Sequence, residues 1–166
     1  VLVNAAGITN SHSTTDSTSS FVQMIQTNLI AVYETCSVAS GYMKASGGGS
    51  IINITGIGSE LGFAGNPGYA SSKGGLKMLT KALANDLAEF NIRVNNIAPG
   101  YIRTDMTKGS YENQALHQDR INRMIIKRWG EAGDLSGAAI LLASDASSYI
   151  TGIDLFIDGG WTAKGL

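Results

Sequence analysis

Apolar runs of strand length alternate along the chain with longer segments of helical period. Four short apolar runs, at residues 1–5, 50–55, 93–98 and 155–157, are each followed by Gly, Asn or Asp residues that can form a turn. This alternation is typical of repeated βα units, in which the strands form a parallel sheet. The pattern therefore predicts an α/β fold with four parallel strands covered by helices.

Three segments between or after these strands are predicted to be helices. The first carries an apolar residue every three or four positions, which is the spacing of one helix face: Phe21, Ile25, Leu29, Val32, Cys36, Ala39 and Met43. A second apolar stripe runs from Leu76 to Phe90, and Asn91 is expected to end that helix. Asp134 is the predicted N-cap of the third. Residues 9–20 are predicted to form a surface loop, and residues 100–109 a mobile loop over a cleft.

The composition indicates one folded and nearly neutral domain. A length of 166 residues is typical of a single domain, and 43% hydrophobic with 15% charged residues excludes a disordered chain. The net charge of -1, without runs of like charge, argues against a nucleic-acid or membrane-surface binder. No apolar stretch approaches the roughly 20 residues that span a bilayer.

Cysteine and histidine usage argues against a disulfide or a metal site. Cys36 is the only cysteine, and its place on an apolar helix face favours packing over reactivity. His12 and His117 are far apart and lack a third ligand pattern. We therefore expect no metal and a cytoplasmic location.

The chain begins with Val1-Leu2-Val3, an apolar sequence typical of a buried strand, with no Met and no polar residues before it. We expect the sequence to begin within a domain, so that residues 1–166 form a single, partial domain. In an open parallel sheet, ligands bind beyond the carboxyl ends of the strands. The segments to inspect are therefore residues 4–7, 55–59, 99–104 and 158–160.

Tyr69 and Lys73 carry the strongest chemical signal. They are four residues apart, which places them on one face of a helix. A phenol with a pKa near 10 is a poor base at neutral pH, but a neighbouring ammonium favours the phenolate. Lowering the pKa by two to three units requires roughly 3 to 4 kcal/mol. We expect Lys73 to lower the pKa of Tyr69, and the small residues from Ala70 to Gly75 to leave room for a flat ligand.

The order of the motifs resembles that of the short-chain dehydrogenase/reductase family. Residues 4–7, Asn4-Ala5-Ala6-Gly7, are similar to its Asn-Ala-Gly strand-end motif, and Asn28 lies where its active-site Asn is found. Tyr69 and Lys73 match Tyr-x-x-x-Lys, and residues 99–104 match Pro-Gly-x-Ile-x-Thr. The resemblance covers all 166 residues. It implies the later βα units of a Rossmann-type, doubly wound parallel sheet.

The resemblance also implies roles for these residues. Tyr69 would act as general acid/base, Lys73 would hold the nicotinamide ribose, and Asn28 would link Lys73 to solvent through a water. The catalytic set is thus Asn28, Tyr69 and Lys73. The implied residues for binding NAD or NADP are Asn4, Ala5, Ala6, Gly7, Tyr69, Lys73, Pro99, Gly100, Ile102 and Thr104.

The sequence departs from the family pattern in two places. The glycine-rich turn that receives the cofactor pyrophosphate has no counterpart, and the residue that selects NAD or NADP is missing with it. Gly56 stands thirteen residues before Tyr69, where the family has a catalytic serine. Three interpretations remain open: Ser59 substitutes for that serine, the activity is weak, or Gly56 is an engineered or inactivating change.

The resemblance implies an oxidoreductase that moves hydride between NAD or NADP and a secondary alcohol or ketone of sugar, polyol or 3-oxoacyl type. The expected partners are a small-molecule substrate and further copies of the chain in a homodimer or homotetramer, with neither nucleic acid nor membrane. A rival interpretation is a catalytically impaired or non-catalytic, oligomer-forming remnant. Gly56 and the missing cofactor-binding half motivate that rival.

Overall fold

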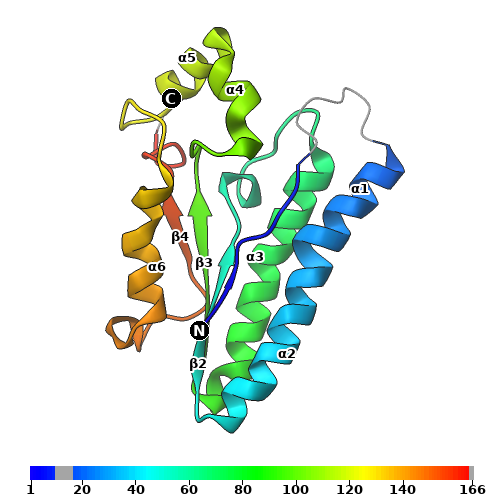
Figure 1. Cartoon of the computed structure of the whole chain (residues 1–166), viewed down its shortest axis with the longest axis vertical. Helices are drawn as coiled ribbons and strands as arrows, with labels where there is room; N and C mark the ends of the chain where they lie inside the picture. The colour runs from blue at the N-terminus through cyan, green and yellow to red at the C-terminus, as the bar shows by residue number, and fades with distance from the viewer. Residues whose placement is uncertain (10–16, 165–166) are drawn as a thin grey trace.

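Four parallel strands form the centre of the protein in a computed structural model that describes residues 1–9 and 17–164. They lie side by side in the order β1 (Leu2–Asn4), β2 (Gly49–Ile54), β3 (Ile92–Pro99) and β4 (Asp154–Ile157) (Figure 1). Each strand overlaps its predicted range, so the predicted α/β fold with a parallel sheet is confirmed. The sheet and its helices match part of a doubly wound Rossmann-type fold.

The long helix predicted between β1 and β2 is present, with an interruption. It comprises α1 (Thr18–Ile25), one π-helical segment (Gln26–Ile30) and α2 (Ala31–Ala45). A π-helical segment inside a helix is rare and is frequent at functional sites. Of the loop predicted at residues 9–20, residues 10–16 lie outside the described residues, and the helix begins at Thr18.

The helix between β2 and β3 is longer than its apolar stripe suggested. After a short 3-10 segment (Ile57–Ser59), α3 runs over Pro67–Leu87 and continues in a 3-10 turn (Ala88–Phe90). Asn91 follows with a φ of 59°, the left-handed conformation that commonly ends a helix. The prediction for Asn91 is therefore confirmed.

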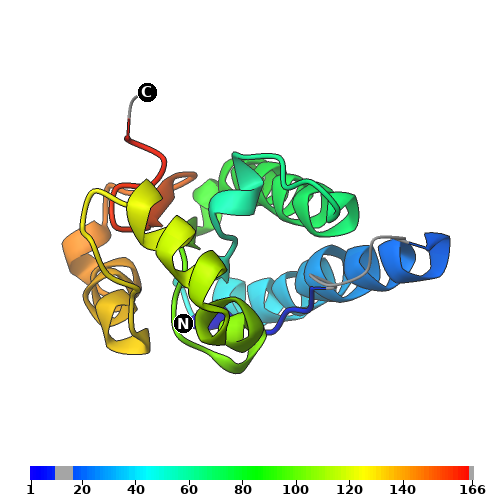
Figure 2. The same cartoon turned by 90° about the horizontal axis from the view of Figure 1, so that it is seen from above.

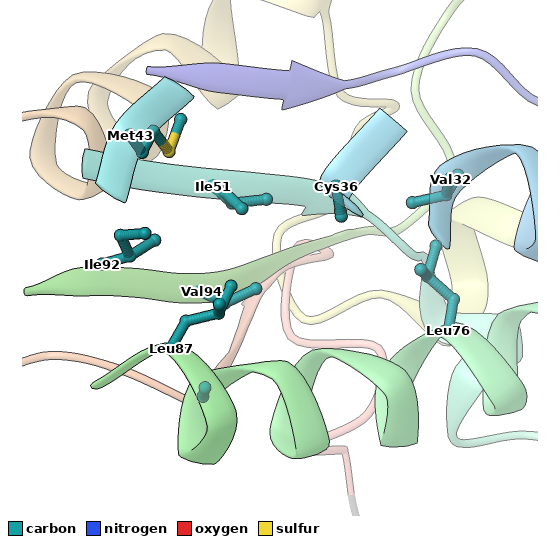
Figure 3. Close-up of a cluster of buried hydrophobic side chains, with 9 residues drawn as sticks. Val32, Cys36, Met43, Ile51, Leu76, Leu87, Ile92 and Val94 are labelled. Carbon is teal, nitrogen blue, oxygen red and sulfur yellow. The ribbon is translucent and has the colours of Figure 1, made fainter. Parts of the chain in front are cut away.

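The sheet lies between two helical layers, because successive strand residues point to opposite faces. Ile51 packs with α2 and α3, whereas its neighbour Ile52 packs with α6 (Ser136–Ala143) on the other face. The larger core cluster joins α2 and α3 to the middle strands (Figure 3): Val32, Cys36, Met43, Ile51, Leu76, Ala84, Leu87, Ile92 and Val94.

A row of polar residues crosses this otherwise apolar sheet. Asn4, Asn53, Asn96 and Asp154 are register partners on the four strands. Asn53 Nδ2 donates to Thr80 Oγ1 at 2.8 Å, and Thr80 Oγ1 donates to Asn96 Oδ1 at 2.7 Å. Asn4 and Asp154 extend the row at 2.8 Å on either side. These bonds fix α3 against the strands two turns from Lys73.

The predicted helix cap at Asp134 is wrong. Asp134 is not an N-cap: it lies in a 3-10 segment (Ala132–Leu135) capped by Glu131, and α6 begins at Ser136. The Asp134 carboxylate accepts from the Glu131 amide at 2.7 Å and pairs with Arg128.

The segment predicted as a mobile loop over a cleft at residues 100–109 is helical from Asp105 onward, and its first residues line the cavity described below. It contains a 3-10 turn (Asp105–Thr107) and the start of α4 (Lys108–Glu112), after which α5 follows (Gln114–Arg123). Thr104 and Thr107 form a reciprocal capping box that starts the turn. Both helices lie beyond the carboxyl ends of the strands (Figures 1 and 2). Neither is apolar enough for periodicity to reveal it.

One further 3-10 turn (Asp145–Ser147) leads from α6 toward β4. Within the described ranges, no helix combines the length and the apolar character needed to cross a bilayer.

Candidate active site

Tyr69 and Lys73 lie one turn apart near the start of α3, beside the end of β2. Lys73 is 4% exposed, and its Nζ donates to the carbonyl oxygen of Ile54, the last residue of β2, at 2.8 Å. The same Nζ lies 5.8 Å from the centroid of the Tyr69 ring. The structure therefore brings the two side chains together at the strand ends, as the helical spacing predicted.

Two glycines shape the space around Tyr69. A Cβ atom on Gly58 would lie 2.9 Å from Tyr69 Cε1, so only glycine lets the ring pack there. A Cβ on Gly56 would lie 3.3 Å from the Tyr69 hydroxyl. Gly56 also has a φ of 136°, a conformation that other residues rarely adopt. The backbone at position 56 thus suits glycine and lies directly beside the phenol.

The expected effect of Lys73 on Tyr69 is absent, and the correction has a physical cause. Burial, with a smaller contribution from the Tyr101 phenol, raises the pKa of Tyr69 to about 12. Burial also lowers the pKa of Lys73 to about 8. The ammonium is held by the Ile54 carbonyl. Desolvation of both groups therefore outweighs their attraction, and the phenol keeps its proton at neutral pH.

Asn28 lies in the π-helical segment and is fully buried. Its Oδ1 accepts from the Ile8 amide at 2.8 Å, and its Nδ2 donates to the Ile8 carbonyl at 2.9 Å and to Ser72 Oγ at 3.0 Å. A Cβ on Gly7 would lie 3.3 Å from Asn28 Oδ1 and 3.5 Å from Lys73 Nζ. Asn28 and Lys73 thus flank one small space over Gly7.

The residues of the predicted cofactor segment 4–7 have different surroundings in the structure. Asn4 is used structurally, because its Nδ2 donates to Asn53 Oδ1 at 2.8 Å and to Cys36 Sγ at 3.3 Å. Ala5 and Ala6 are exposed beyond the end of β1. Gly7 lies against Lys73, as described above. Of this segment, Gly7 is therefore the residue that lies next to Asn28 and Lys73.

The residues of the predicted cofactor segment 99–104 also lie in different places. Pro99 and Gly100 line the cavity at Tyr69, and a Cβ on Gly100 would lie 2.7 Å from Asp158 Cα. Ile102 is buried and lines a different, smaller cavity of about 160 Å³. Thr104 is exposed, and its hydroxyl lies 3.3 Å from that of Thr107. The structure thus places Pro99 and Gly100, but neither Ile102 nor Thr104, on the Tyr69 cavity.

The cavity at Tyr69 has a volume of about 640 Å³, within the range of small-molecule sites. It lies between the start of α3 and the helices α4 and α5. Its walls combine apolar residues with eight polar ones: Thr9, Ile57, Gly58, Gly62, Phe63, Ala64, Gly65, Asn66, Tyr69, Pro99, Gly100, Tyr101, Met106, Thr107, Ser110, Leu116, Arg120, Arg123 and Trp161.

The geometry argues against Ser59 as a substitute for a serine at position 56. Its Oγ donates to the Gly56 carbonyl at 2.7 Å, and it is not among the described residues that line the cavity. Its hydroxyl instead closes the 3-10 turn that follows Gly56. Of the three interpretations of Gly56, the geometry argues against substitution by Ser59.

The sequence gives no signal for several of the residues that line the cavity. Asn66 is the residue before α3, and Arg120 and Arg123 lie on α5. The two arginines are three residues apart, so they share a helix face, but this spacing is common on solvated helices. Trp161 lines the cavity, whereas Trp129 is buried against Tyr101 at a ring distance of 5.3 Å.

The described residues hold no group of three His, Cys, Asp or Glu side chains placed to bind a metal. Cys36 is buried in the core, and burial raises the pKa of its thiol to about 11. The site chemistry therefore rests on Tyr69, Lys73 and the cavity beside them.

Comparison with known proteins places this site in context. Residues 1–162 match the family described as Enoyl-(Acyl carrier protein) reductase. The chain is 41% identical over 161 residues to 5-keto-D-gluconate 5-reductase of Escherichia coli K12, covering 96% of this chain and 63% of that protein. It is 41% identical over 163 residues to 3-oxoacyl-(acyl-carrier-protein) reductase FabG of Chlamydia pneumoniae, covering 98% and 65%.

A solved structure shows the same fold over nearly all of the chain. It is a gluconate 5-dehydrogenase from Burkholderia cenocepacia in complex with NADP and tartrate, with a TM-score of 0.94 and 35% identity. The match covers 99% of this chain and 65% of that one. The chain thus spans slightly less than two thirds of the length of these relatives.

Proposed function

The chain belongs to the short-chain dehydrogenase/reductase family, and on that premise we propose that the full-length protein interconverts a ketone and a secondary alcohol with NAD or NADP. The observation that carries the proposal is the meeting of the Tyr69 phenol and the buried Lys73 ammonium at the strand ends, beside a cavity of about 640 Å³. A proton donor at such a position serves a carbonyl that enters the cavity.

Tyr69 is the group that moves the proton. Its pKa of about 12 keeps the phenol protonated at neutral pH, so it can donate to the oxygen of a ketone as that oxygen gains charge. In the opposite direction, the phenolate would accept the proton of an alcohol.

The residues around Lys73 fit a nicotinamide cofactor. The Lys73 ammonium has three donors, of which the Ile54 carbonyl takes one, and the absence of a side chain on Gly7 keeps the space beside Nζ open for ribose hydroxyls. Pro99 and Gly100 on the cavity wall would hold the nicotinamide. When bound, the cofactor supplies or accepts the hydride. Asn28 positions the Ile8 backbone and Ser72 beside this space.

The names of the relatives support an oxo-group substrate. Two relatives are reductases of a keto sugar acid and of a 3-oxoacyl carrier protein, and one solved relative contains NADP and tartrate. For the protein described here, the proposed substrate is accordingly a small ketone of the keto-acid or 3-oxoacyl class.

The test is an assay of the full-length protein with NADH and NADPH over a panel of keto acids, keto sugars and 3-oxoacyl thioesters. The proposal predicts substrate-dependent loss of nicotinamide absorbance at 340 nm. The same panel with Lys73→Met checks that turnover depends on the site. Cofactor binding without oxidation of the cofactor by any ketone would instead favour the non-catalytic interpretation, which Gly56 motivates.

A further inference from the structure

Two positive side chains line the Tyr69 cavity, and they are the charged groups among its described lining residues. Arg120 and Arg123 extend from α5, opposite the start of α3 that carries Tyr69. No carboxylate lies on the cavity wall within the described residues. A cavity lined by one sign of charge attracts the opposite sign.

Asp119 holds the two arginines without neutralising both. Its Oδ2 accepts from Arg120 Nη1 at 2.6 Å, and its Oδ1 accepts from Arg123 Nε at 3.2 Å. Two guanidinium groups and one carboxylate leave a net positive charge. Each guanidinium has five donors, so most donors of both remain available for another acceptor within the part of the chain that the structure describes.

Aromatic rings fix the direction of both guanidinium groups. The Arg120 guanidinium lies 4.9 Å from the centroid of the Tyr101 ring, and that of Arg123 lies 5.7 Å from the Trp161 ring. Tyr101 and Trp161 both line the cavity and contact each other, with ring centroids 5.0 Å apart. The Arg120 side chain, 22% exposed, is thus held against the cavity wall, whereas the Arg123 side chain, 59% exposed, reaches the cavity from its solvent side.

Two polar atoms of the cavity residues have unmet hydrogen-bonding capacity. Arg120 Nε, a donor, and Asn66 Oδ1, an acceptor, are buried without a partner among the described residues. Asn66 is 8% exposed, and its Nδ2 donates to Thr9 Oγ1 at 2.7 Å. It precedes α3, but its side chain does not cap that helix. Buried polar atoms are nearly always paired in folded proteins, and these two unpaired atoms belong to residues that line the cavity.

From this arrangement we infer that Arg120 and Arg123 bind the carboxylate of the substrate, and that Asn66 Oδ1 accepts a hydrogen bond from one of its hydroxyl groups. Guanidinium groups bind carboxylates with paired, charge-assisted hydrogen bonds. The substrate class is then a polyhydroxy keto acid, which presents a carboxylate, hydroxyls and the ketone that Tyr69 protonates. A 3-oxoacyl thioester has no carboxylate to place at the arginines. The inference rests on the proposed function and narrows it.

The test compares two ketones of equal carbon number in the full-length protein: a six-carbon keto acid such as 5-ketogluconate and the neutral keto sugar fructose. We expect kcat/KM to be at least tenfold higher for the acid. Arg123→Met and Arg120→Lys should raise KM for the acid by about tenfold with a smaller change in kcat, and change KM for fructose less than twofold. Arg120→Lys keeps the positive charge and the aliphatic part of the side chain, so a change in its kinetics is not explained by misfolding.

Arg103→Met is the matched control. Arg103 is half-exposed, pairs with Glu131 at 2.9 Å and lies outside the Tyr69 cavity. Arg103→Met therefore removes one positive charge, as Arg123→Met does, but not from the cavity wall. We expect it to leave the preference for the acid unchanged. Equal losses on both ketones in the arginine variants, or a wild-type preference for fructose or a 3-oxoacyl thioester, would overturn the inference.

A binding measurement separates this inference from the proposed function. Calorimetric titration of the full-length protein with tartrate should show binding that weakens at high salt and in Arg123→Met, but not in Arg103→Met. If no ketone is reduced, the proposed function fails while tartrate binding still decides the role of the arginines. If ketones are reduced but tartrate binds all variants equally, only the role of the arginines is wrong.

Discussion

Gly56 lies directly beside the hydroxyl of Tyr69, at a distance where an added Cβ atom would stand 3.3 Å from the phenol oxygen. The position therefore has the right location for a second hydroxyl donor but the wrong backbone, because its φ of 136° suits glycine. Gly56 thus leaves the Tyr69 hydroxyl without a side-chain neighbour at this position. The consequences can be measured.

Gly56→Ser and Gly56→Ala form a matched pair for this position. Both variants should lose about 1–2 kcal/mol of unfolding free energy from the strained φ. Only serine restores a donor beside Tyr69, and such donors contribute roughly 100-fold or more to turnover when well placed. We expect kcat of Gly56→Ser to exceed that of Gly56→Ala by at least tenfold. Equal kcat values would show that a hydroxyl at this position has no access to the substrate.

Ser59→Ala tests the other candidate for the missing serine. The Ser59 hydroxyl donates to the Gly56 carbonyl, so its removal should cost about 1 kcal/mol of stability. We expect kcat to change less than threefold, because Ser59 is outside the residues described as lining the cavity. Steady-state kinetics with the substrate found in the ketone panel measures this. A loss of more than tenfold at unchanged folding would make Ser59 the donor after all.

Lys73→Met should make the protein more stable while removing its activity. Burial lowers the pKa of Lys73 from 10.5 to about 8, which corresponds to a cost of roughly 3 kcal/mol for the buried charge. The lost hydrogen bond to Ile54 offsets about 1–2 kcal/mol of the gain. We therefore expect a net gain of about 1–2 kcal/mol at pH 7, measured by urea unfolding.

The pH dependence of this gain has a definite sign. The folded state binds Lys73's proton more weakly than the unfolded state, so wild-type stability rises between pH 8 and 10.5 as Lys73 loses its charge. The advantage of Lys73→Met should therefore be largest below pH 8 and shrink as the pH approaches 10.5. A difference that grows with pH would show that Lys73 is not a buried, destabilised ammonium.

Thr80→Val tests the polar row that fixes α3 to the sheet. The Thr80 hydroxyl bonds both Asn53 and Asn96, and all three residues are fully buried. Valine has nearly the same shape but leaves two buried amide atoms unpaired, so we expect a loss of about 2–4 kcal/mol of stability. Thr18→Val, at an exposed position outside the row, should cost less than about 1 kcal/mol. Similar losses in both variants would argue against a structural role for the row.

The sequence predicted the scaffold well because its signals are local. Each strand was a short apolar run, and the turn at Asn91 was marked by a residue that tolerates a positive φ. Tyr69 and Lys73 could be paired from their spacing alone, since helix geometry fixes their common face. The prediction that Asp134 caps a helix was wrong because its carboxylate pairs with Arg128, six residues earlier in the chain.

The electrostatics and the far wall of the site could not be predicted in this way. The direction of the Tyr69 pKa depends on how deeply the phenol and Lys73 are buried, which is a property of the packed structure. Arg120 and Arg123 reach the cavity because α5 folds over the strand ends, and their local sequence resembles that of any solvated helix. Tertiary placement gives these residues their significance.

The most direct test of the account is the effect of Tyr69→Phe on kcat for ketone reduction by the full-length protein. Phenylalanine keeps the ring that packs on Gly58 and removes only the proton donor. We predict a fall in kcat of at least 100-fold, with folding and cofactor binding unchanged. A kcat within threefold of wild type would contradict the assignment of proton transfer to Tyr69.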